Sequence, residues 1–280
     1  MKEIFETISK EAEKYLVSNG LKSMVLGISG GIDSTVVAAI CSDVSKRSGI
    51  PLIGVSLVSD TNEEAENVTA DLVGIAFCGS GANYHKANIQ STYEAVSEFC
   101  QLKSSGGVAL YHGTKISEGN IKARLRMIAL YNIASQTGGL VMDTDNLTEH
   151  YLGFFTIHGD VADLNPIGDL WKHEVYELAK WIRDNSNDQA VKDAINASIN
   201  LVPTDGNGVM PGGDLAQIAP GSTYNEVDAI LGRIVSGDLG GSGKVFDQVL
   251  DRYKRSEYKR SPLPARIRIP SRYFPSDDGR

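Results

Sequence analysis

The chain has 280 residues, of which 41% are hydrophobic and 22% charged, a composition typical of a globular protein that can bury a core. Its formal net charge of −8 argues against a general role on nucleic acid or on an anionic membrane, because both partners are themselves negative. Its three cysteines lack CxxC spacing and indicate no zinc site, and no apolar run predicts a membrane span, so we expect a cytoplasmic protein.

The amino-terminal half alternates apolar runs with helical patterns. Residues 1–20 carry apolar side chains at helical spacing among acids and lysines, unlike a secretory signal. An apolar run at 24–28 stops at Ser29-Gly30-Gly31 and leads into a helical pattern, and a second run at 52–58 precedes a Glu- and Ala-rich segment at 61–73. Strands that alternate with helices predict a parallel sheet covered on both faces.

The rest of the chain continues this alternation and then turns helical. We expect a weaker strand at 75–78, helices at about 89–102 and 121–134, a strand at 140–142 and a helix at about 170–183. Residues 203–220 are rich in glycine, proline and polar residues, which predicts a mobile lid loop over a site. Helices follow at 224–235 and about 244–258. The sequence predicts a single domain over residues 1–280, an α/β fold with a doubly wound parallel sheet and C-terminal helices.

The loop Ser29-Gly30-Gly31-Ile32-Asp33-Ser34 has the residue types of a pyrophosphate site. A glycine pair after a buried strand lets the backbone approach an anion, and the next helix presents unpaired N–H groups. The serines add hydroxyl donors, while Asp33 suits a Mg²⁺ ion that bridges phosphate oxygens. An ordinary glycine turn explains the glycines but not the serines or the aspartate. Neither GxGxxG nor a Walker A loop is present, which argues against a dehydrogenase or a kinase.

This loop resembles the pyrophosphate loop of the ATP pyrophosphatase, or adenine-nucleotide α-hydrolase-like, superfamily, whose members adenylate a carboxylate or a carbonyl. Further motifs, in the right order and over most of the chain, are similar to those of ammonia-dependent NAD synthetase. They are the segments 119–127 (GNIKARLRM), 143–149 (DTDNLTE), 153–156 (GFFT), 159–163 (GDVAD), 165–172 (NPIGDLWK) and 257–260 (EYKR). The resemblance implies a Rossmann-like adenine-nucleotide α-hydrolase fold.

The same resemblance implies a ligand for each matching position. Asp33 and Glu149 are implied to hold Mg²⁺, and Asp33 and Lys172 to be catalytic, with Lys172 offsetting negative charge as pyrophosphate leaves. The residues implied to bind ATP are Gly27, Ile28, Ser29, Gly30, Gly31, Ile32, Asp33, Ser34, Thr144, Lys172 and Thr204. Those implied to bind deamido-NAD are Arg124, Asp163, Tyr258 and Lys259.

The implied reaction is an ATP-dependent ligation in two steps. The nicotinate carboxylate of deamido-NAD attacks the α-phosphorus of ATP and releases pyrophosphate, and ammonia then displaces AMP to form the amide of NAD. No protein nucleophile is required, and no segment is recognisable as a glutamine-hydrolysing domain, so free ammonia is the expected nitrogen donor. The resemblance also implies a homodimer.

Plainer interpretations stand beside these assignments. Arg124 and Arg126 lie two residues apart on a predicted helix and face different sides, so one of them fits a solvated surface role. Glu149 also fits an ordinary first-turn acid of a helix. Two positions depart from the family pattern, since Ile157 stands where many members have lysine and Tyr258 where many have histidine. The segment 159–163 is also slightly short, which weakens the assignment of its last aspartate.

Two other functions stay open at this stage. A tRNA-modifying member of the same superfamily would use the same loop to adenylate a base carbonyl, although the acidic balance and the lack of paired cysteines argue against it. A non-catalytic nucleotide-binding regulator would retain ATP and release no pyrophosphate when deamido-NAD and ammonium are supplied.

Overall fold

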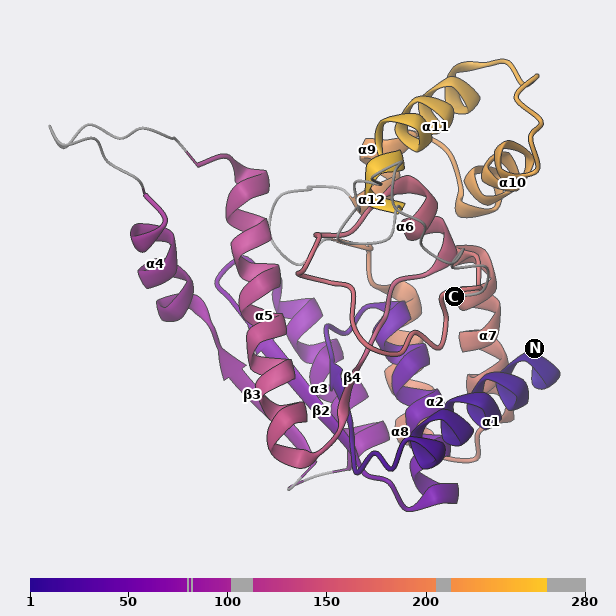
Figure 1. Ribbon diagram of the computed structural model, residues 1–280. Coiled ribbons are helices and arrows are strands. Elements are labelled where there is room, and N and C mark those ends of the chain that lie inside the picture. Colours follow the sequence, from indigo (N-terminus) through magenta and orange to yellow (C-terminus); the bar gives the residue numbers. More distant parts are fainter. Residues whose placement is uncertain (80, 82, 102–112, 205–212, 261–280) are drawn as a thin grey trace, which may run out of the picture.

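The centre of the molecule is a four-stranded parallel sheet in the order β3-β2-β1-β4 (Figure 1). The computed structural model describes residues 1–79, 81, 83–101, 113–204 and 213–260. The strands are β1 (Met24–Gly27), β2 (Leu52–Val58), β3 (Tyr84–Asn88) and β4 (Leu140–Met142). Met24 of β1 lies opposite Leu52 of β2 and Leu140 of β4. Strand order reverses between β1 and β4, and open α/β sheets bind ligands beyond the carboxyl ends of their strands at such a point.

Both faces of the sheet are covered, as the alternation of strands and helices predicts. Met24 and Leu26 of β1 pack into the larger core, whereas Val25 between them packs into a second core with Val55 and Val141. The larger core is formed with α1 (Lys2–Ser18), α2 (Ile32–Ser48), α3 (Glu64–Cys78), α7 (Lys172–Asn185) and α8 (Gln189–Asn200). The second is formed with α5 (Lys115–Thr137), which carries α4 (Gln90–Phe99) on its outer side.

The C-terminal helices form a third core of their own. Leu152, Ile218, Leu231 and Phe246 are buried together there. The helices involved are α6 (Leu147–Leu152), α9 (Gly213–Ile218), α10 (Tyr224–Val235) and α11 (Lys244–Arg255), with α12 (Glu257–Arg260) beside them. Figure 1 shows them grouped around α6, beyond the end of the sheet from which β4 leads into that helix.

Three expectations from the sequence differ from the structure. The strand predicted at 75–78 is wrong, because these residues end α3; the third strand is β3, whose side chains are mostly exposed and give no apolar run. Helix α8 was not predicted, although Val191, Ala194, Ile195 and Ser198 are buried at helical spacing. The loop predicted at 203–220 contains α9 and the buried Ala219, while its residues 205–212 lie outside the described part.

Other expectations on element positions are met within a few residues. The helices predicted at 121–134, 170–183 and 224–235 are α5, α7 and α10, and the strands at 24–28, 52–58 and 140–142 are β1, β2 and β4. None of the described helices is both long and apolar enough to cross a membrane.

Candidate active site

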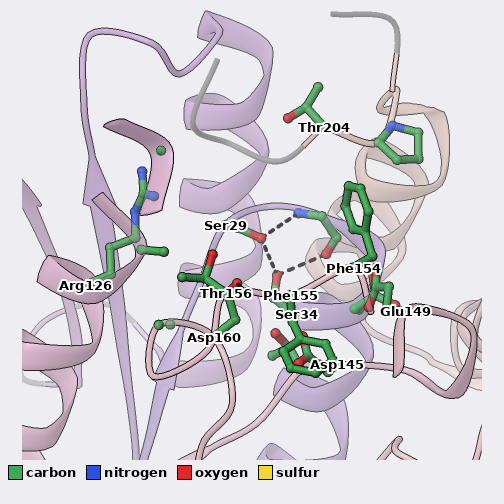
Figure 2. A pocket seen from close by; sticks show the side chains of 18 of the residues that line it. Ser29, Ser34, Arg126, Asp145, Glu149, Phe154, Phe155, Thr156, Asp160 and Thr204 are labelled. Carbon is green, nitrogen blue, oxygen red and sulfur yellow. Dashed lines mark hydrogen bonds between the residues drawn. The ribbon is translucent and has the colours of Figure 1, made fainter. Parts of the chain in front are cut away.

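The loop between β1 and α2 presents backbone N–H groups and hydroxyls at the carboxyl end of the sheet. Gly30 has a φ of +85°, and a Cβ on it would lie 2.8 Å from both the Ala70 nitrogen and the Glu66 carbonyl oxygen of α3. Only glycine fits such a position. Ser29 Oγ and Ser34 Oγ lie 3.1 Å apart (Figure 2). Because the loop leads into the N-terminus of a 17-residue helix, it is a ready site for an anion.

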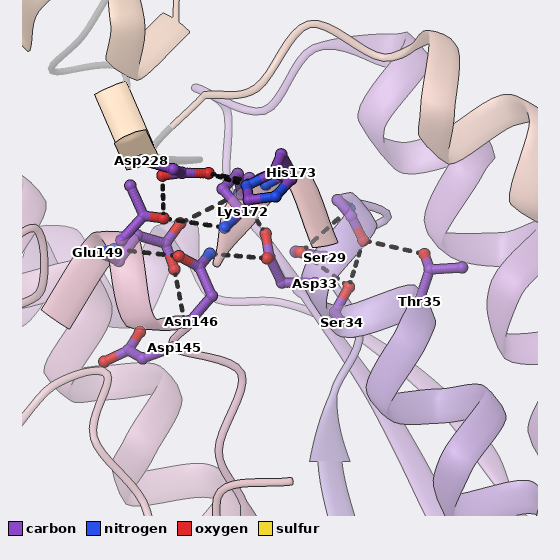
Figure 3. Close-up of polar contacts among 12 residues, drawn as sticks. Ser29, Asp33, Ser34, Thr35, Asp145, Asn146, Glu149, Lys172, His173 and Asp228 are labelled. Atoms are coloured by element: carbon purple, nitrogen blue, oxygen red, sulfur yellow. Dashed lines mark hydrogen bonds and ion pairs between the residues drawn. The ribbon is translucent and has the colours of Figure 1, made fainter. Parts of the chain in front are cut away.

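The ammonium group of Lys172 lies between two carboxylates next to this loop. Its Nζ is 2.5 Å from Asp33 Oδ2 and 3.2 Å from Glu149 Oε1 (Figure 3). The Lys172 side chain is 3% exposed, whereas each carboxylate is 16% exposed. The three residues come from the starts of α7, α2 and α6, so the fold brings Asp33 to two residues that lie more than a hundred positions away in the sequence. A buried ion pair adds little net stability to a fold. This pair is therefore of interest for where it places its charges in the site.

Asn146 fixes the spacing of the two carboxylates. Its side-chain oxygen accepts a hydrogen bond from the Glu149 N–H at 3.0 Å and caps α6, while its Nδ2 donates to Asp33 Oδ1 at 2.9 Å. Glu149 completes a capping box, since its Oε2 accepts from the Asn146 N–H at 3.1 Å. Glu149 is therefore both a first-turn helix residue and a carboxylate that reaches Lys172.

A buried carboxylate on α10 supports the same cluster from the far side. Asp228, which is 2% exposed, accepts hydrogen bonds from the Thr148 hydroxyl at 2.5 Å and from the His173 N–H at 3.0 Å. The Thr148 hydroxyl oxygen accepts from the Lys172 N–H at 2.8 Å. Asp228 is not among the residues predicted from the sequence, although its place next to Val227 on the apolar face of a predicted helix is unusual for an aspartate.

Three aspartates around the end of β4 have raised pKa values. Burial raises the pKa of Asp143 and of Asp160, against the opposing effect of backbone N–H groups that hydrogen-bond to them. Burial also raises the pKa of Asp145 well above its usual range, and neighbouring carboxylates, Asp143 first, add to the shift. Among the described residues, none donates a hydrogen bond to the Asp145 carboxylate. Lys259 attracts the charge of Asp145, but burial and the neighbouring carboxylates outweigh this attraction.

A cavity of about 570 Å³ joins these groups. Its walls come from the loop after β1, the end of β2, α5, the segment after α6 and the C-terminal helices. The basic side chains that line it are Arg126, Lys172, Arg252, Arg255 and Lys259. The predicted site residues that line it are Gly27, Ile28, Ser29, Gly31, Ile32, Asp33, Ser34, Thr144, Glu149, Lys172, Thr204, Tyr258 and Lys259. Such a basic, concave site suits an anionic nucleotide.

The two arginines of the 119–127 segment point to different places, as their spacing predicts. Arg126 lines the cavity, and its Nε donates to the Leu57 carbonyl at the end of β2 at 3.0 Å. Arg124, which was predicted to bind deamido-NAD, is exposed, does not line the cavity and donates to the Ile157 carbonyl at 3.2 Å. Arg126 belongs to the same motif, but no ligand was predicted for it. It lines the cavity, whereas Arg124 does not.

Asp163 also lies outside the cavity. Its carboxylate accepts hydrogen bonds from the Tyr131 hydroxyl at 3.0 Å and from the Val141 N–H of β4 at 2.9 Å. Burial and the nearby Asp163 raise the pKa of Tyr131 to about 12, so this hydroxyl stays protonated and donates. In this arrangement Asp163 holds its own segment against β4, while Asp160 from the same segment lines the cavity.

The remaining predicted ligands lie at the edges of the cavity. Thr204 donates from its hydroxyl to the carboxylate of Glu66, a residue 6% exposed that the sequence analysis did not single out. Lys259 donates to the Gly153 carbonyl at 2.8 Å and to the Phe155 carbonyl, and burial lowers the pKa of Lys259. Tyr258 is 65% exposed. Lys259 therefore orders the segment after α6 as well as facing the cavity.

The residues present fit a magnesium ion that is shared with a nucleotide. Among the described residues no group of three or more His, Cys, Asp or Glu side chains could hold a metal by itself. However, Asp33 and Glu149 both reach the Nζ of Lys172, which shows that the two carboxylates converge on a cation. Because Mg²⁺ is typically bound through one or two carboxylates together with substrate phosphates, this pair beside the phosphate loop is a sufficient protein contribution.

Comparisons with known proteins agree with this geometry. Residues 4–263 match the family model described as NAD synthase. NH(3)-dependent NAD(+) synthetases from Finegoldia magna and Vibrio atlanticus are 30% and 32% identical to the chain, over 91% and 89% of it and 92% and 87% of their own lengths. The structure of NMN synthetase from Francisella tularensis superposes with a TM-score of 0.77 at 27% identity, covering 96% of this chain and 98% of that one.

A second solved structure, the NH3-dependent NAD synthetase from Campylobacter jejuni in complex with the nitrate ion, superposes with a TM-score of 0.68 at 25% identity, over 95% of this chain and 99% of that one. These matches confirm the resemblance and the fold class that the sequence predicts. They leave the roles of the single site residues as predictions. On the family model and on relatives matched over most of their length, the chain belongs to the NAD synthase family.

Proposed function

We propose that the chain amidates the nicotinate of deamido-NAD with free ammonia at the expense of ATP, through an adenylated intermediate. The observation that carries the proposal is the cluster of Lys172, Asp33 and Glu149 beside a helix N-terminus in a basic cavity. The positive charges of Lys172 and of the helix N-terminus would stabilise the negative charge that develops on a leaving pyrophosphate. Family membership supports a ligase that forms a carbon–nitrogen bond.

In the first step an oxygen of the nicotinate carboxylate forms a bond to the α-phosphorus of ATP, and the bond from that phosphorus to pyrophosphate breaks. The N–H groups at the start of α2 and the hydroxyls of Ser29 and Ser34 bind the pyrophosphate. Asp33 and Glu149 would hold Mg²⁺, which supplies positive charge to the phosphate oxygens. Lys172, held by both carboxylates, balances the charge of the leaving pyrophosphate.

In the second step ammonia attacks the carbonyl carbon of the adenylate, and the carbon–oxygen bond to AMP breaks. The nitrogen loses a proton to solvent as the amide forms. No side chain of the chain becomes covalently attached, because the adenylate is itself the activated form of the carboxylate. Catalysis in this step depends on positioning the adenylate and on excluding water, which would otherwise hydrolyse it.

A second candidate substrate is nicotinate mononucleotide, whose amide is nicotinamide mononucleotide (NMN). Two of the four residues predicted to bind the dinucleotide, Arg124 and Asp163, lie outside the cavity and are held by other groups. The superposed Francisella tularensis structure is named for NMN and has the higher of the two TM-scores given above. Ile157 and Tyr258, where many relatives have lysine and histidine, also concern dinucleotide contacts rather than ATP contacts.

One assay tests the proposal and separates the two substrates. The purified protein is incubated with ATP, Mg²⁺ and ammonium together with either deamido-NAD or nicotinate mononucleotide, and the dinucleotide or mononucleotide amide, AMP and pyrophosphate are measured. We expect equal amounts of amide, AMP and pyrophosphate, with a higher kcat/KM for deamido-NAD. A preference for the mononucleotide would contradict deamido-NAD as the substrate but would leave the proposed reaction unchanged. ATP retention without pyrophosphate release on either substrate would contradict an enzymatic role.

We further propose that the enzyme is homodimeric, as the resemblance implies, and cytoplasmic, as the sequence pattern leads us to expect. Support for a second copy comes from α5, on which Ile128 and Tyr131, one turn apart, are 66% and 40% exposed. Large apolar side chains on an otherwise regular helix face indicate a surface that another chain can cover. Light scattering coupled to gel filtration measures this directly.

A further inference from the structure

The first turn of α10 lies against the first turn of α7. Thr223 caps α10, because its side chain accepts a hydrogen bond from the Glu226 N–H at 3.3 Å, and Tyr224 is the first residue of the helix. Asp228 follows four residues later, on the same face of α10 as Tyr224. Since Asp228 accepts a hydrogen bond from the His173 N–H at 3.0 Å, this face of α10 is held at the start of α7.

The ring of Tyr224 contacts two residues of α7. The Nζ of Lys172 lies over the ring, 5.6 Å from its centroid, and the centroid of the Tyr176 ring is 5.9 Å away at an interplanar angle of 32°. Lys172 and Tyr176 are one turn apart and both line the cavity, whereas the half-buried Tyr224 does not. A side chain in this place acts on a bound nucleotide through its neighbours rather than by contact.

The ammonium group of Lys172 depends on two carboxylates that have a second task in the proposed reaction. Its side chain is 3% exposed, so little solvent stabilises its charge. Asp33 and Glu149 neutralise it in the ligand-free site, at 2.5 and 3.2 Å, but the same two carboxylates would hold Mg²⁺. When both bind a divalent cation, their attraction for Lys172 is reduced, because that cation is the largest charge in the site. Lys172 then needs a contact for which the metal ion does not compete.

The face of an aromatic ring is a contact of this kind. Its negative electrostatic potential attracts an ammonium group that lies within about 6 Å of the ring centroid, and the attraction is larger where the group is shielded from water. The ring carbon atoms are not ligands of Mg²⁺, which binds oxygen atoms. The ring of Tyr224 therefore attracts Lys172 whether or not the two carboxylates hold the metal ion.

We propose that Tyr224 is a positioning residue for Lys172, and that the face of its ring holds the ammonium group in the site while Asp33 and Glu149 bind Mg²⁺. The inference rests on the proposed function, because it concerns the charge that Lys172 presents to the leaving pyrophosphate. That charge is needed most as the pyrophosphate leaves, so Tyr224 affects the rate of this step more than the binding of ATP.

The first test separates the ring of Tyr224 from its hydroxyl group. Tyr224→Phe keeps the ring, whereas Tyr224→Leu replaces it with an apolar side chain that has no ring face. At saturating Mg²⁺ and nicotinate substrate, we expect kcat for pyrophosphate release to fall about three- to thirtyfold in Tyr224→Leu, with KM for ATP changed less than about twofold. Tyr224→Phe should keep about half of the rate or more. An equal loss in both variants, or no loss in either, would overturn the role of the ring.

Tyr93→Leu on α4 is the matched control. The Nζ of Lys122 lies over the Tyr93 ring, 4.7 Å from its centroid, and Lys122 is 4% exposed, so this pair resembles the pair of Tyr224 and Lys172. Neither Tyr93 nor Lys122 lines the cavity. We therefore expect Tyr93→Leu to lower stability but to release pyrophosphate at the normal rate. An equally slow rate in Tyr93→Leu would overturn a specific role for Tyr224.

The second test requires no activity. A double-mutant cycle with Tyr224→Leu, Lys172→Met and both substitutions together is measured by urea unfolding without ligands. We expect Tyr224→Leu to raise the unfolding equilibrium constant about two- to thirtyfold more in the unaltered background than in the Lys172→Met background. Equal effects in the two backgrounds would overturn the attraction between the two side chains.

These results separate the inference from the proposed function. If the unaltered protein releases no pyrophosphate with either nicotinate substrate, the proposed function fails, whereas the cycle still decides whether the ring attracts Lys172. If the unaltered protein is active and Tyr224→Leu releases pyrophosphate at the normal rate, only the inference fails. All rates are measured at a temperature at which the unfolding curves show every variant to be folded, so a slow rate cannot come from unfolding.

Discussion

Asp145 is a residue whose surroundings in the folded chain favour its protonated form. Its pKa is raised by burial and by neighbouring carboxylates, so the unfolded chain loses this proton at a lower pH than the folded chain does. Stability is therefore unaffected below the usual pKa of an aspartate and falls as the pH rises from there towards the raised value. Asp145→Asn removes this loss. We expect the melting temperature of the variant to exceed that of the unaltered protein at pH 7.5, by about 2–4 °C for each kcal/mol regained.

The comparison is made by thermal unfolding between pH 4.5 and pH 8 without ligands, and the difference is expected to shrink towards the acidic end. Asp169→Asn is the matched control, because Asp169 also lies on the segment that follows β4 but is exposed. Its effect should stay within about 0.5 kcal/mol at every pH. A variant of Asp145 that is less stable at pH 7.5 would show that the carboxylate has a stabilising partner. The expected rise in melting temperature would show that the Asp145 carboxylate lowers the stability of the folded chain.

The site residues that could be predicted are those whose functional groups lie close together in the sequence. The loop from Ser29 to Ser34 combines glycines, hydroxyls and a carboxylate within six residues, and this combination indicates a phosphate site without any knowledge of the fold. Asp228 and Glu66 could not be recognised in the same way. Their roles depend on burial and on partners, Thr148 and Thr204, that are distant in the sequence.

At the scale of an element, the loop between β1 and α2 depends on its close contact with α3. Gly30→Ala would place a Cβ 2.8 Å from backbone atoms of α3 and would also impose a positive φ on alanine. The φ alone costs about 1–2 kcal/mol, and the clash displaces the loop as well. We expect weaker ATP binding, by about tenfold or more, because the N–H groups that we propose to bind phosphate move with the loop. Calorimetric titration with ATP and Mg²⁺ measures this.

Gly49→Ala is the control for that experiment. Gly49 also has a positive φ, +75°, but a Cβ on it would meet nothing within 4 Å, and it lies at the opposite end of α2. Urea unfolding should show a similar cost of the φ in both variants, with ATP affinity lost only in Gly30→Ala. Loss of affinity in both, or in neither, would contradict a specific role for the contact between the loop and α3.

Elements were predictable where burial gives a regular pattern. β1 and β2 lie inside the sheet, β4 is a buried edge strand, and all three are apolar runs in the sequence. β3 is an edge strand with mostly exposed side chains, and it lacks such a run. The apolar residues at 75–78 belong to the last turn of α3, where Phe77 packs into the core. A short apolar run does not distinguish a buried strand from the end of a buried helix.

At the scale of the whole molecule, alternation of strands and helices indicates a parallel sheet but not the order of its strands. The order β3-β2-β1-β4 places the loops after β1 and β4 side by side, and this adjacency assembles Asp33 with Asn146. The C-terminal helices were predicted as additions to the domain. Their contribution to the site, through Asp228 and Lys259, depends on tertiary contacts that helical periodicity does not describe.

Asp228 connects the C-terminal helices to the cluster around Lys172, and its substitution tests whether they take part in the proposed chemistry. In Asp228→Asn one acceptor oxygen becomes an amide, so the hydrogen bonds from Thr148 and His173 cannot all be kept. We expect the unfolding free energy to fall by about 1.5–3 kcal/mol and pyrophosphate release to slow about ten- to a hundredfold at saturating ATP, because Lys172 loses its fixed position.

Asp251→Asn on α11 is the matched control, since Asp251 is exposed and pairs only with Arg255 in the described part of the chain. Urea unfolding and the rate of pyrophosphate release are measured for both variants at a temperature where both are folded. If Asp228→Asn lost stability but released pyrophosphate at the normal rate, the contact of the C-terminal helices through Asp228 would contribute to stability alone and not to the reaction. A slow rate in a folded Asp228→Asn, with Asp251→Asn unaffected, would show that α10 positions Lys172 for the release of pyrophosphate.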